Sequence, residues 1–176
     1  MFLIAGLGNP GLEYAGNRHN LGFMVVDELG RRLGVTFRQT KTDALIADYF
    51  GEEKRLLLAK PQTFMNESGR SVKMIASFFK LPLDAMLVVH DDLDLPFGDV
   101  RLKDSGGSAG HNGVQSVIEH LGSRDFKRLR IGIGRPPGSM DPAAFVLKDF
   151  SKEERRDIDF IVGEAADIAV KTFENS

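Results

Sequence analysis

The chain has 176 residues, of which 42% are hydrophobic and 27% are charged, and its formal net charge is −2. This length and composition are typical of one globular domain with its own hydrophobic core, so we expect a single domain over residues 1–176. The chain contains no cysteine, which excludes disulfides, thiolate metal sites and a cysteine nucleophile.

The net charge argues against a broad polycationic surface, although a local basic patch would suffice to bind nucleic acid. No apolar run approaches the roughly 20 residues of a transmembrane helix. Met1–Gly6 leads straight into a turn and lacks the basic region and long apolar core of a signal peptide. We therefore expect a cytoplasmic protein that has no contact with a membrane.

The first predicted element is Phe2–Gly6, a short apolar run bounded by glycine that is typical of a buried strand. Glycine and proline break the stretch that follows, Leu7–Gly11, so we expect a loop there. Helical periodicity begins at Leu21. Asn9 therefore follows the carboxyl end of a strand, and His19 lies where the next helix begins. Open α/β sheets bind ligands at this edge.

Residues Gly6–Gly11 also match the dinucleotide-binding pattern G-x-G-x-x-G. That function requires a helix that opens at the last glycines and offers its amino end to a pyrophosphate. Here Pro10 removes one donor, Gly16 interrupts such a helix, and the next acid on a predicted strand, Asp48, lies too far along the chain. A tight turn after a strand is the simpler interpretation, and a dinucleotide site is the alternative.

Two strands are predicted at Ala44–Phe50 and Arg55–Ala59, joined in a hairpin. Asn66 comes after the second strand and just before a helical stretch whose apolar face includes Val72 and Ile75. Asn66 is therefore either the N-cap of that helix or a member of the site at the sheet edge.

Met86–Val89 is a continuous apolar run, as expected for a strand that is covered on both faces. It leads into three carboxylates, Asp91, Asp92 and Asp94, which we expect to lie in a turn past the strand end. Three interpretations are open. The carboxylates bind a divalent cation, although their spacing fits no calcium loop; one of them orients a histidine from another segment; or they form a solvated turn.

Asp99–Lys103 is a further predicted strand, and Ser105–Gly113 is a glycine- and serine-rich loop before a short helix. Within the loop, Gly106–Gly110 matches the nucleophile elbow G-x-S-x-G. A serine hydrolase with Ser108 as nucleophile is nevertheless disfavoured. No histidine follows His120 to complete the triad order, and the loop is too long and loose for an elbow.

The segment Arg124–Arg135 carries five basic residues and one acid, while Leu129 and Ile131 alternate with its arginines as in a strand. The basic side chains form either a solvated edge or a contact for phosphates, for which arginine is well suited. Asp141–Pro142 predicts a helix start, and Ser151–Glu154 predicts a capping box. We interpret these last segments as scaffold.

Polar side chains thus follow three different predicted strands, at Asn9, Asn66 and Asp91, while His19 and Asn112 lie at loop-to-helix junctions. Convergence of such groups on one sheet edge is how α/β sites are built. A histidine can take a proton from water, a carboxylate can fix its tautomer, and amide groups can donate to an oxyanion. This set suffices for attack of water on an ester, with no metal, serine or cysteine.

Five separated motifs, which span most of the chain in order, resemble those of bacterial peptidyl-tRNA hydrolases. They are Gly6–Gly11 with Tyr14 and Arg18–Asn20, Lys60–Gly69, His90–Asp94, Gly110–Gly113 and Arg130–Gly134. The resemblance implies a single-domain α/β fold with a twisted mixed β-sheet flanked by helices and a site at the carboxyl ends of the strands. It also implies that a monomer without cofactor or metal hydrolyses the ester between a peptide and the 3′ end of tRNA, which rescues tRNA for translation.

By resemblance, His19 would be the general base and Asp91 its orienting partner. Asn9 and Asn66 would position the substrate or the water and stabilise the intermediate. His111 would be architectural or a minor contact. An RNA-binding relative that has lost hydrolysis is an alternative from another class, and the intact pair of His19 and Asp91 disfavours it.

The resemblance further implies four substrate-binding residues, which are Tyr14, Met65, Asn66 and Asn112. Asn112 would contact the peptide or the terminal nucleotide, and Lys103 and Arg130 would clamp the 5′ phosphate of the tRNA. The loop Ser105–Gly113 contains less glycine than is usual in this family, which affects its expected mobility and not the chemistry. Family members often extend further at the carboxyl end.

Overall fold

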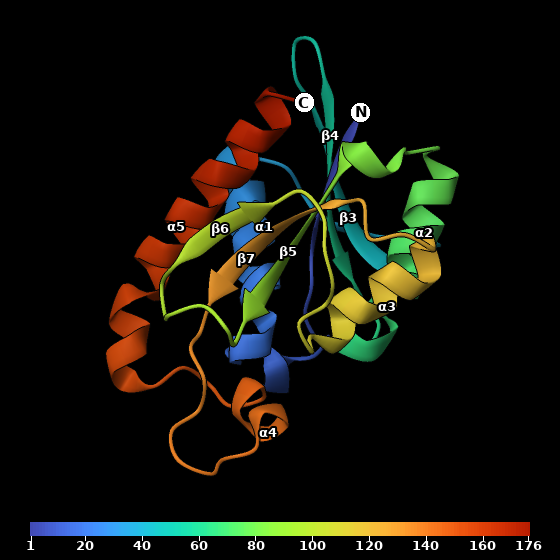
Figure 1. The fold of residues 1–176 in the computed structure, drawn as a ribbon. Coiled ribbons are helices and arrows are strands. Elements are labelled where there is room, and N and C mark those ends of the chain that lie inside the picture. Colours follow the sequence, from blue (N-terminus) through green and yellow to red (C-terminus); the bar gives the residue numbers. More distant parts are fainter.

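A mixed seven-stranded sheet forms the centre of the computed structural model, which describes residues 1–176 (Figure 1). The order of the strands across the sheet is β2-β3-β4-β1-β5-β7-β6. Their bounds are Phe2–Gly6 for β1, Arg38–Gln39 for β2, Ala44–Phe50 for β3, Arg55–Pro61 for β4, Met86–Asp92 for β5, Val100–Lys103 for β6 and Lys127–Gly132 for β7. The predicted α/β class and the predicted hairpin are confirmed.

The four central strands β4, β1, β5 and β7 run parallel to one another, and the remaining strands pair antiparallel outside them. Because parallel strands point the same way, their carboxyl ends meet at one edge of the sheet. The loops that follow β1, β4 and β5 therefore start side by side, although they are far apart in the sequence.

Helices cover both faces of the sheet (Figure 1). The five α-helices are α1 (Leu21–Leu33), α2 (Ser68–Phe78), α3 (Asn112–Leu121), α4 (Pro142–Val146) and α5 (Lys152–Glu174). Short 3-10 turns occupy Leu12–Tyr14, Arg18–Asn20, Met65–Glu67 and Leu83–Ala85. None of the helices combines the length and the hydropathy that a membrane span requires.

Two hydrophobic cores result, one on each face of the sheet. Alternate strand residues such as Ile4 and Val89 pack against α1 and α5, while their neighbours Leu3 and Val88 pack under α2 and α3. Every residue of β1 and β5 is buried. This double burial explains why both strands are continuous apolar runs rather than alternating ones.

The predicted end of β5 was wrong. The strand does not stop at Val89 but continues through Asp92, and its last residues pair with β7 from Arg130 to Gly132. Asp91 and Asp92 are consequently buried inside the sheet, whereas Asp94 lies exposed in the turn that follows. A solvated acidic turn is therefore excluded for the first two carboxylates.

The helix caps follow the sequence signals. Gly34 and Gly122 end α1 and α3 in the left-handed conformation that glycine adopts most easily. Asp141 caps α4, and Ser151 with Glu154 forms the predicted capping box of α5.

The second strand of the hairpin, β4, extends to Pro61, two residues past its predicted end.

Candidate active site

The loop after β1 and the start of α1 lie against each other at the edge of the sheet. A Cβ added to Gly6 would meet the carbonyl oxygen of Gly22 at 2.2 Å, so the two backbones approach more closely than any other residue would allow. The glycines of the G-x-G pattern thus serve packing and place His19 beside the strand ends. The helix that a dinucleotide site requires at Gly11 is absent, because a three-residue 3-10 turn follows that glycine.

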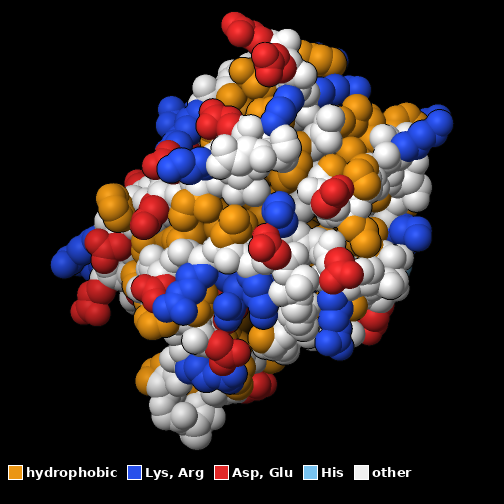
Figure 2. Space-filling view, turned by 45° about the horizontal axis from the view of Figure 1, so that its top comes forward, with side chains coloured by type: hydrophobic (Ala, Val, Ile, Leu, Met, Phe, Trp, Pro, Cys, Tyr) orange, Lys and Arg blue, Asp and Glu red, His pale blue; other side chains and the backbone are white.

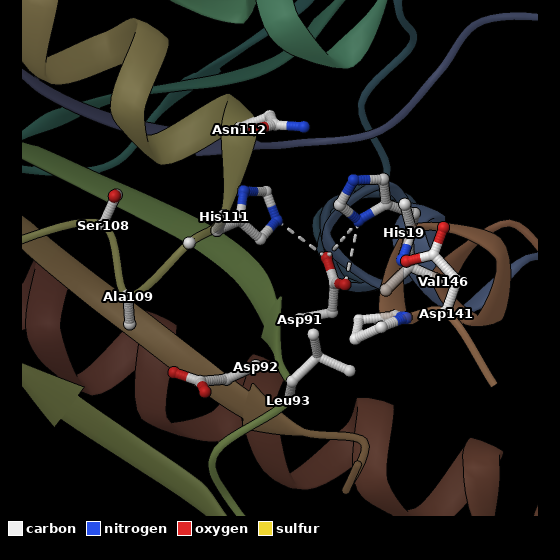
Figure 3. Close-up of a pocket in the computed structure, with 13 residues that line it drawn as sticks. His19, Asp91, Asp92, Leu93, Ser108, Ala109, His111, Asn112, Asp141 and Val146 are labelled. Carbon is white, nitrogen blue, oxygen red and sulfur yellow. Dashed lines mark hydrogen bonds and ion pairs between the residues drawn. The ribbon is translucent and has the colours of Figure 1, made fainter. Parts of the chain in front are cut away.

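Asp91 lies at the centre of the site, between two histidines (Figure 3). Its Oδ2 is 2.9 Å from Nδ1 of His19, and its Oδ1 is 2.9 Å from Nε2 of His111. The side chain of Asp91 is only 2% exposed. Burial raises the pKa of Asp91, but the charges and hydrogen bonds of His19 and His111 lower it more, so the net pKa is well below its usual range. Asp91 is therefore a buried carboxylate that stays ionised.

The tautomer of His111 follows from its own hydrogen bonds. Its Nδ1 accepts from the backbone N–H groups of Gly113 and Val114, which makes His111 the N-cap of α3. A nitrogen that accepts carries no proton, so Nε2 of His111 holds the proton and donates to Asp91. The expected architectural role of His111 is present as the cap. Its contact with Asp91 is a further role that the sequence pattern did not predict.

His19 is bound to the other oxygen of Asp91 and is largely buried. Because the carboxylate can only accept, Nδ1 of His19 donates and Nε2 of the neutral ring is left with a free lone pair. Burial lowers the pKa of His19, but the charge and hydrogen bond of Asp91 outweigh burial and raise the pKa above its ordinary value. His19 is thus a base held in one tautomer by an ionised partner.

A third histidine, His90, lies behind the pair on β5. Its Nδ1 donates to the backbone carbonyl of Asp91 at 2.7 Å, and its ring meets the ring of His111 edge-on. Its Nε2 is buried and has no partner. Burial, helped by the neighbouring His111, lowers the pKa of His90 to about 3, so this histidine stays neutral.

Asn9 is fixed by two residues from different elements. Its backbone N–H and C=O bind the side chain of Asn20, and its side-chain Oδ1 accepts from the backbone N–H of Met65 at 2.7 Å. With Oδ1 occupied, the amide NH₂ of Asn9 is left as a donor. The sequence did not predict that the side chain of Asn20 fixes the backbone of Asn9.

Asn66 lies exposed in the 3-10 turn after β4, and its side chain makes no hydrogen bond within the protein. It does not cap α2, because Glu67 holds that position without a side-chain cap bond. The N-cap alternative for Asn66 is therefore wrong.

The pocket beside His19 has a volume of about 270 Å³. His19, Asp91 and Asn112 line it together with the loop Ser108–Gly110 (Figure 3). The wall on the far side comes from α4 and its cap, through Asp141, Pro142, Ala143 and Val146. The interpretation of this segment as mere scaffold was wrong, since four of its residues line the pocket.

The remaining predicted site residues do not line this pocket. Asn9 borders a neighbouring groove, Met65 is buried beneath the loop, and Tyr14 is half-buried in the first 3-10 turn. Of the predicted site residues, the structure therefore brings His19, Asp91 and Asn112 together in one pocket.

Within the basic segment 124–135, β7 is an interior strand and does not form a solvated edge, whereas Arg124 and Arg135 at the ends of the segment are exposed. Arg128 is buried and donates to the backbone carbonyls of Gly107 and Arg124, which ties the glycine loop to the sheet. Nε of Arg130 binds Asp92 at 2.8 Å. Lys103 is exposed on the edge strand β6. On the face shown in Figure 2, basic and acidic side chains are interspersed with apolar ones.

A divalent cation would find three ligand atoms within 4.8 Å of one another at His19, Asp91 and His111. These atoms already bind one another as hydrogen-bond donors and acceptors, so the group is satisfied as it stands. The alternative of a cation at the three carboxylates finds no support, because arginines neutralise Asp92 and Asp94.

Known proteins resemble the chain over nearly its full length. The curated peptidyl-tRNA hydrolase of Frankia casuarinae is 52% identical over 94% of this chain and 84% of its own. The chloroplastic peptidyl-tRNA hydrolase of Arabidopsis thaliana is 55% identical over 90% of this chain and 55% of its own. The crystal structure of the Acinetobacter baumannii peptidyl-tRNA hydrolase superposes with a TM-score of 0.87 at 36% identity, covering 99% of this chain and 93% of that one. The family model of peptidyl-tRNA hydrolase matches residues 3–176, and the chain belongs to this family.

Proposed function

We propose that the chain hydrolyses the ester bond between a peptide and the 3′ end of tRNA, and so releases free tRNA for translation. Membership of the family supports the substrate and the reaction. The observation that carries the chemistry is the buried carboxylate of Asp91, which binds the imidazole of His19 at 2.9 Å and leaves its Nε2 free.

In the proposed reaction, Nε2 of His19 takes a proton from a water molecule as the water oxygen attacks the ester carbonyl. Asp91 stabilises the imidazolium that forms and keeps the ring in place. The tetrahedral intermediate then collapses, the bond to the ribose oxygen breaks, and His19 returns its proton to that oxygen. The products are a free carboxylic acid and the tRNA 3′ hydroxyl, with no covalent intermediate and no metal-bound water.

Amide donors would stabilise the negative charge on the carbonyl oxygen. The NH₂ group of Asn9 is free because Oδ1 of this side chain already accepts from Met65. We assign Asn66, whose side chain has no partner in the protein, to the same task. Asn112 at the mouth of the pocket would bind the peptide or the terminal nucleotide, and Tyr14 and Met65 would complete the surface around the substrate.

For the tRNA 5′ phosphate we propose contacts with Lys103 and Arg130. Lys103 is exposed, and Arg130 uses only Nε to bind Asp92, so its two terminal NH₂ groups are available for a phosphate. We further propose that the protein acts as a monomer. We place the activity in the bacterial cytoplasm, where translation would supply the substrate.

The test is release of the acyl group from an N-acetylaminoacyl-tRNA by the wild type and by His19→Ala, with and without a chelator. We expect activity that survives the chelator and falls roughly 10²–10⁴-fold in the variant, the usual contribution of a general base. His120→Ala is the matched control, since this exposed histidine lies outside the pocket. Binding of tRNA without hydrolysis by the wild type would contradict the proposal and favour an RNA-binding function.

A further inference from the structure

Arg18 precedes His19 in the same 3-10 turn, and its side chain is 8% exposed. Its guanidinium donates to Oε1 of Glu154 at 2.6 Å and to the backbone carbonyls of Phe145 and Lys148 at 3.3 and 3.4 Å. The guanidinium carbon also lies 3.9 Å from the centre of the Phe145 ring. A single side chain next to His19 therefore binds both ends of the segment that joins α4 to α5.

Glu154, which binds Arg18, is itself fixed by a hydrogen bond at the start of α5. Glu154 is the third residue of α5 and completes its capping box, and its Oε1 also accepts from the backbone N–H of Ser151. Burial raises the pKa of Glu154, but the Ser151 amide and Arg18 outweigh burial and lower it. The carboxylate is therefore ionised, and Arg18 is attached to the first turn of the longest helix in the chain.

The backbone strengthens the same connection. The N–H of Arg18 donates to the carbonyl oxygen of Lys148 at 3.1 Å, and Asn17 forms an isolated antiparallel bridge with Asp149. Residues 17–18 are thereby joined to residues 145–149. The α4 wall of the pocket comes directly before that segment, with Val146 in both the wall and the connection.

Stability alone is a poor explanation for this arginine. Its Nε is buried without a partner, and an unsatisfied buried donor reduces stability. Well-packed apolar residues often replace a buried ion pair without loss of stability. What an apolar side chain cannot do is bind a carboxylate and two carbonyl groups in one fixed geometry.

We propose that Arg18, held by Glu154, is a positioning residue that sets the α4 wall of the pocket relative to His19. This inference rests on the proposed function, because it takes the α4 wall to bind the peptide part of the substrate. Because His19 is the next residue in the chain and the guanidinium binds the carboxyl end of α4, Arg18 fixes how the ester is presented to Nε2 of His19.

The test compares Arg18→Met and Glu154→Gln with the control Arg32→Met. Arg32 is the matched residue, because its guanidinium also binds α5, through Asp167 and Gly163, but makes no hydrogen bond to α4 or to the segment that follows α4. For each variant, kcat and KM are measured with a peptidyl-tRNA substrate, at a temperature well below the unfolding temperature of that variant. The inhibition constant of deacylated tRNA, which lacks the peptide, is measured under the same conditions.

We expect Arg18→Met to lower kcat/KM on the order of tenfold or more, as misplacement of reacting groups does. The inhibition constant of deacylated tRNA should stay within about twofold of the wild type, as should all constants of Arg32→Met. Glu154→Gln keeps the hydrogen-bond acceptor but not the charge, so its kcat/KM should fall less, and its inhibition constant for deacylated tRNA should also stay unchanged. This variant provides the test if Arg18→Met does not fold.

Unchanged kcat and KM in both folded variants would overturn the positioning role and leave Arg18 as a structural residue. Equal losses in Arg32→Met would overturn it too, because they would reflect general loosening of α5. The wild-type rate separates this inference from the proposed function. An inactive wild type contradicts both, whereas an active wild type with unaffected variants contradicts only the inference.

Discussion

His111 and His19 donate to the same carboxylate but are not equivalent. The Nδ1 of His111 accepts from two backbone amides of α3, so its single proton points at Asp91 and its ring has no free lone pair. His19 has no such constraint on Nε2. One histidine thus supports the carboxylate, and the other is left free to exchange a proton with water.

This difference predicts the effect of His111→Asn. Asparagine is a good N-cap, so α3 should keep its cap while Asp91 loses one of its two imidazole donors. We expect kcat to fall roughly tenfold, since a hydrogen bond to a charged group contributes about 1.5–3 kcal/mol, and thermal stability to fall less than in His111→Ala. Measurement of kcat and of the unfolding temperature for both variants tests this. Equal kcat for wild type and His111→Asn would show that the cap is its only role.

His90 predicts a dependence of stability on pH. Its pKa is about 3 in the folded protein and about 6.5 in the unfolded chain, so between these values the unfolded state binds more protons. The free energy of unfolding should therefore fall as the pH drops below about 6.5, with a slope approaching 1.4 kcal/mol per pH unit. The raised pKa of His19 changes the pH dependence of the free energy of unfolding only above about pH 6.5. At lower pH His19 is protonated in both the folded and the unfolded state.

Denaturant titrations between pH 6.5 and about 5.5 measure that slope, and the lower limit keeps carboxylates with ordinary pKa values of about 3.9–4.3 almost fully ionised. His90→Gln removes the titrating group while it keeps a side-chain donor, so its slope should be smaller by about one proton. Identical slopes in the two proteins would contradict the assignment of a buried, neutral His90.

For the tRNA clamp, Lys103→Ala is a sharper test than Arg130→Ala. Arg130 also neutralises the buried Asp92, and its removal would leave an unpaired charge inside the sheet. Loss of the exposed Lys103 should weaken binding of tRNA that carries a 5′ phosphate and reduce the salt dependence by about one contact. Binding of tRNA without that phosphate should be unchanged. Equal weakening of both tRNAs would contradict the clamp.

Local patterns in the sequence predicted most of the fold. The apolar runs of β1 and β5, the glycine stops after α1 and α3 and the capping box of α5 each depend on residues a few positions apart. The proximity of His19 and Asp91 was also predictable, because both lie at the edge of the sheet where the carboxyl ends of the parallel strands meet.

The errors have a different origin. β5 continues through Asp91 and Asp92 because His19, His111 and Arg130 compensate the two charges from 20 to 72 positions away. The α4 wall lines the pocket because Arg18 binds its backbone from the other end of the chain. Long-range partners of this kind leave no mark on local periodicity, so the sequence predicted a strand that ends at Val89 and a scaffold helix.

The central claim is that neutral His19, held by Asp91, takes the proton from water. Its most direct test is the pH dependence of the single-turnover hydrolysis rate for wild type and Asp91→Asn. In the wild type, the rate should rise with pH through a midpoint above the ordinary histidine value, because Asp91 raises the pKa of His19. In Asp91→Asn, the rate should be lower throughout, and the midpoint should move to lower pH, since burial then acts on His19 without a counter-charge. An unchanged midpoint would contradict the account.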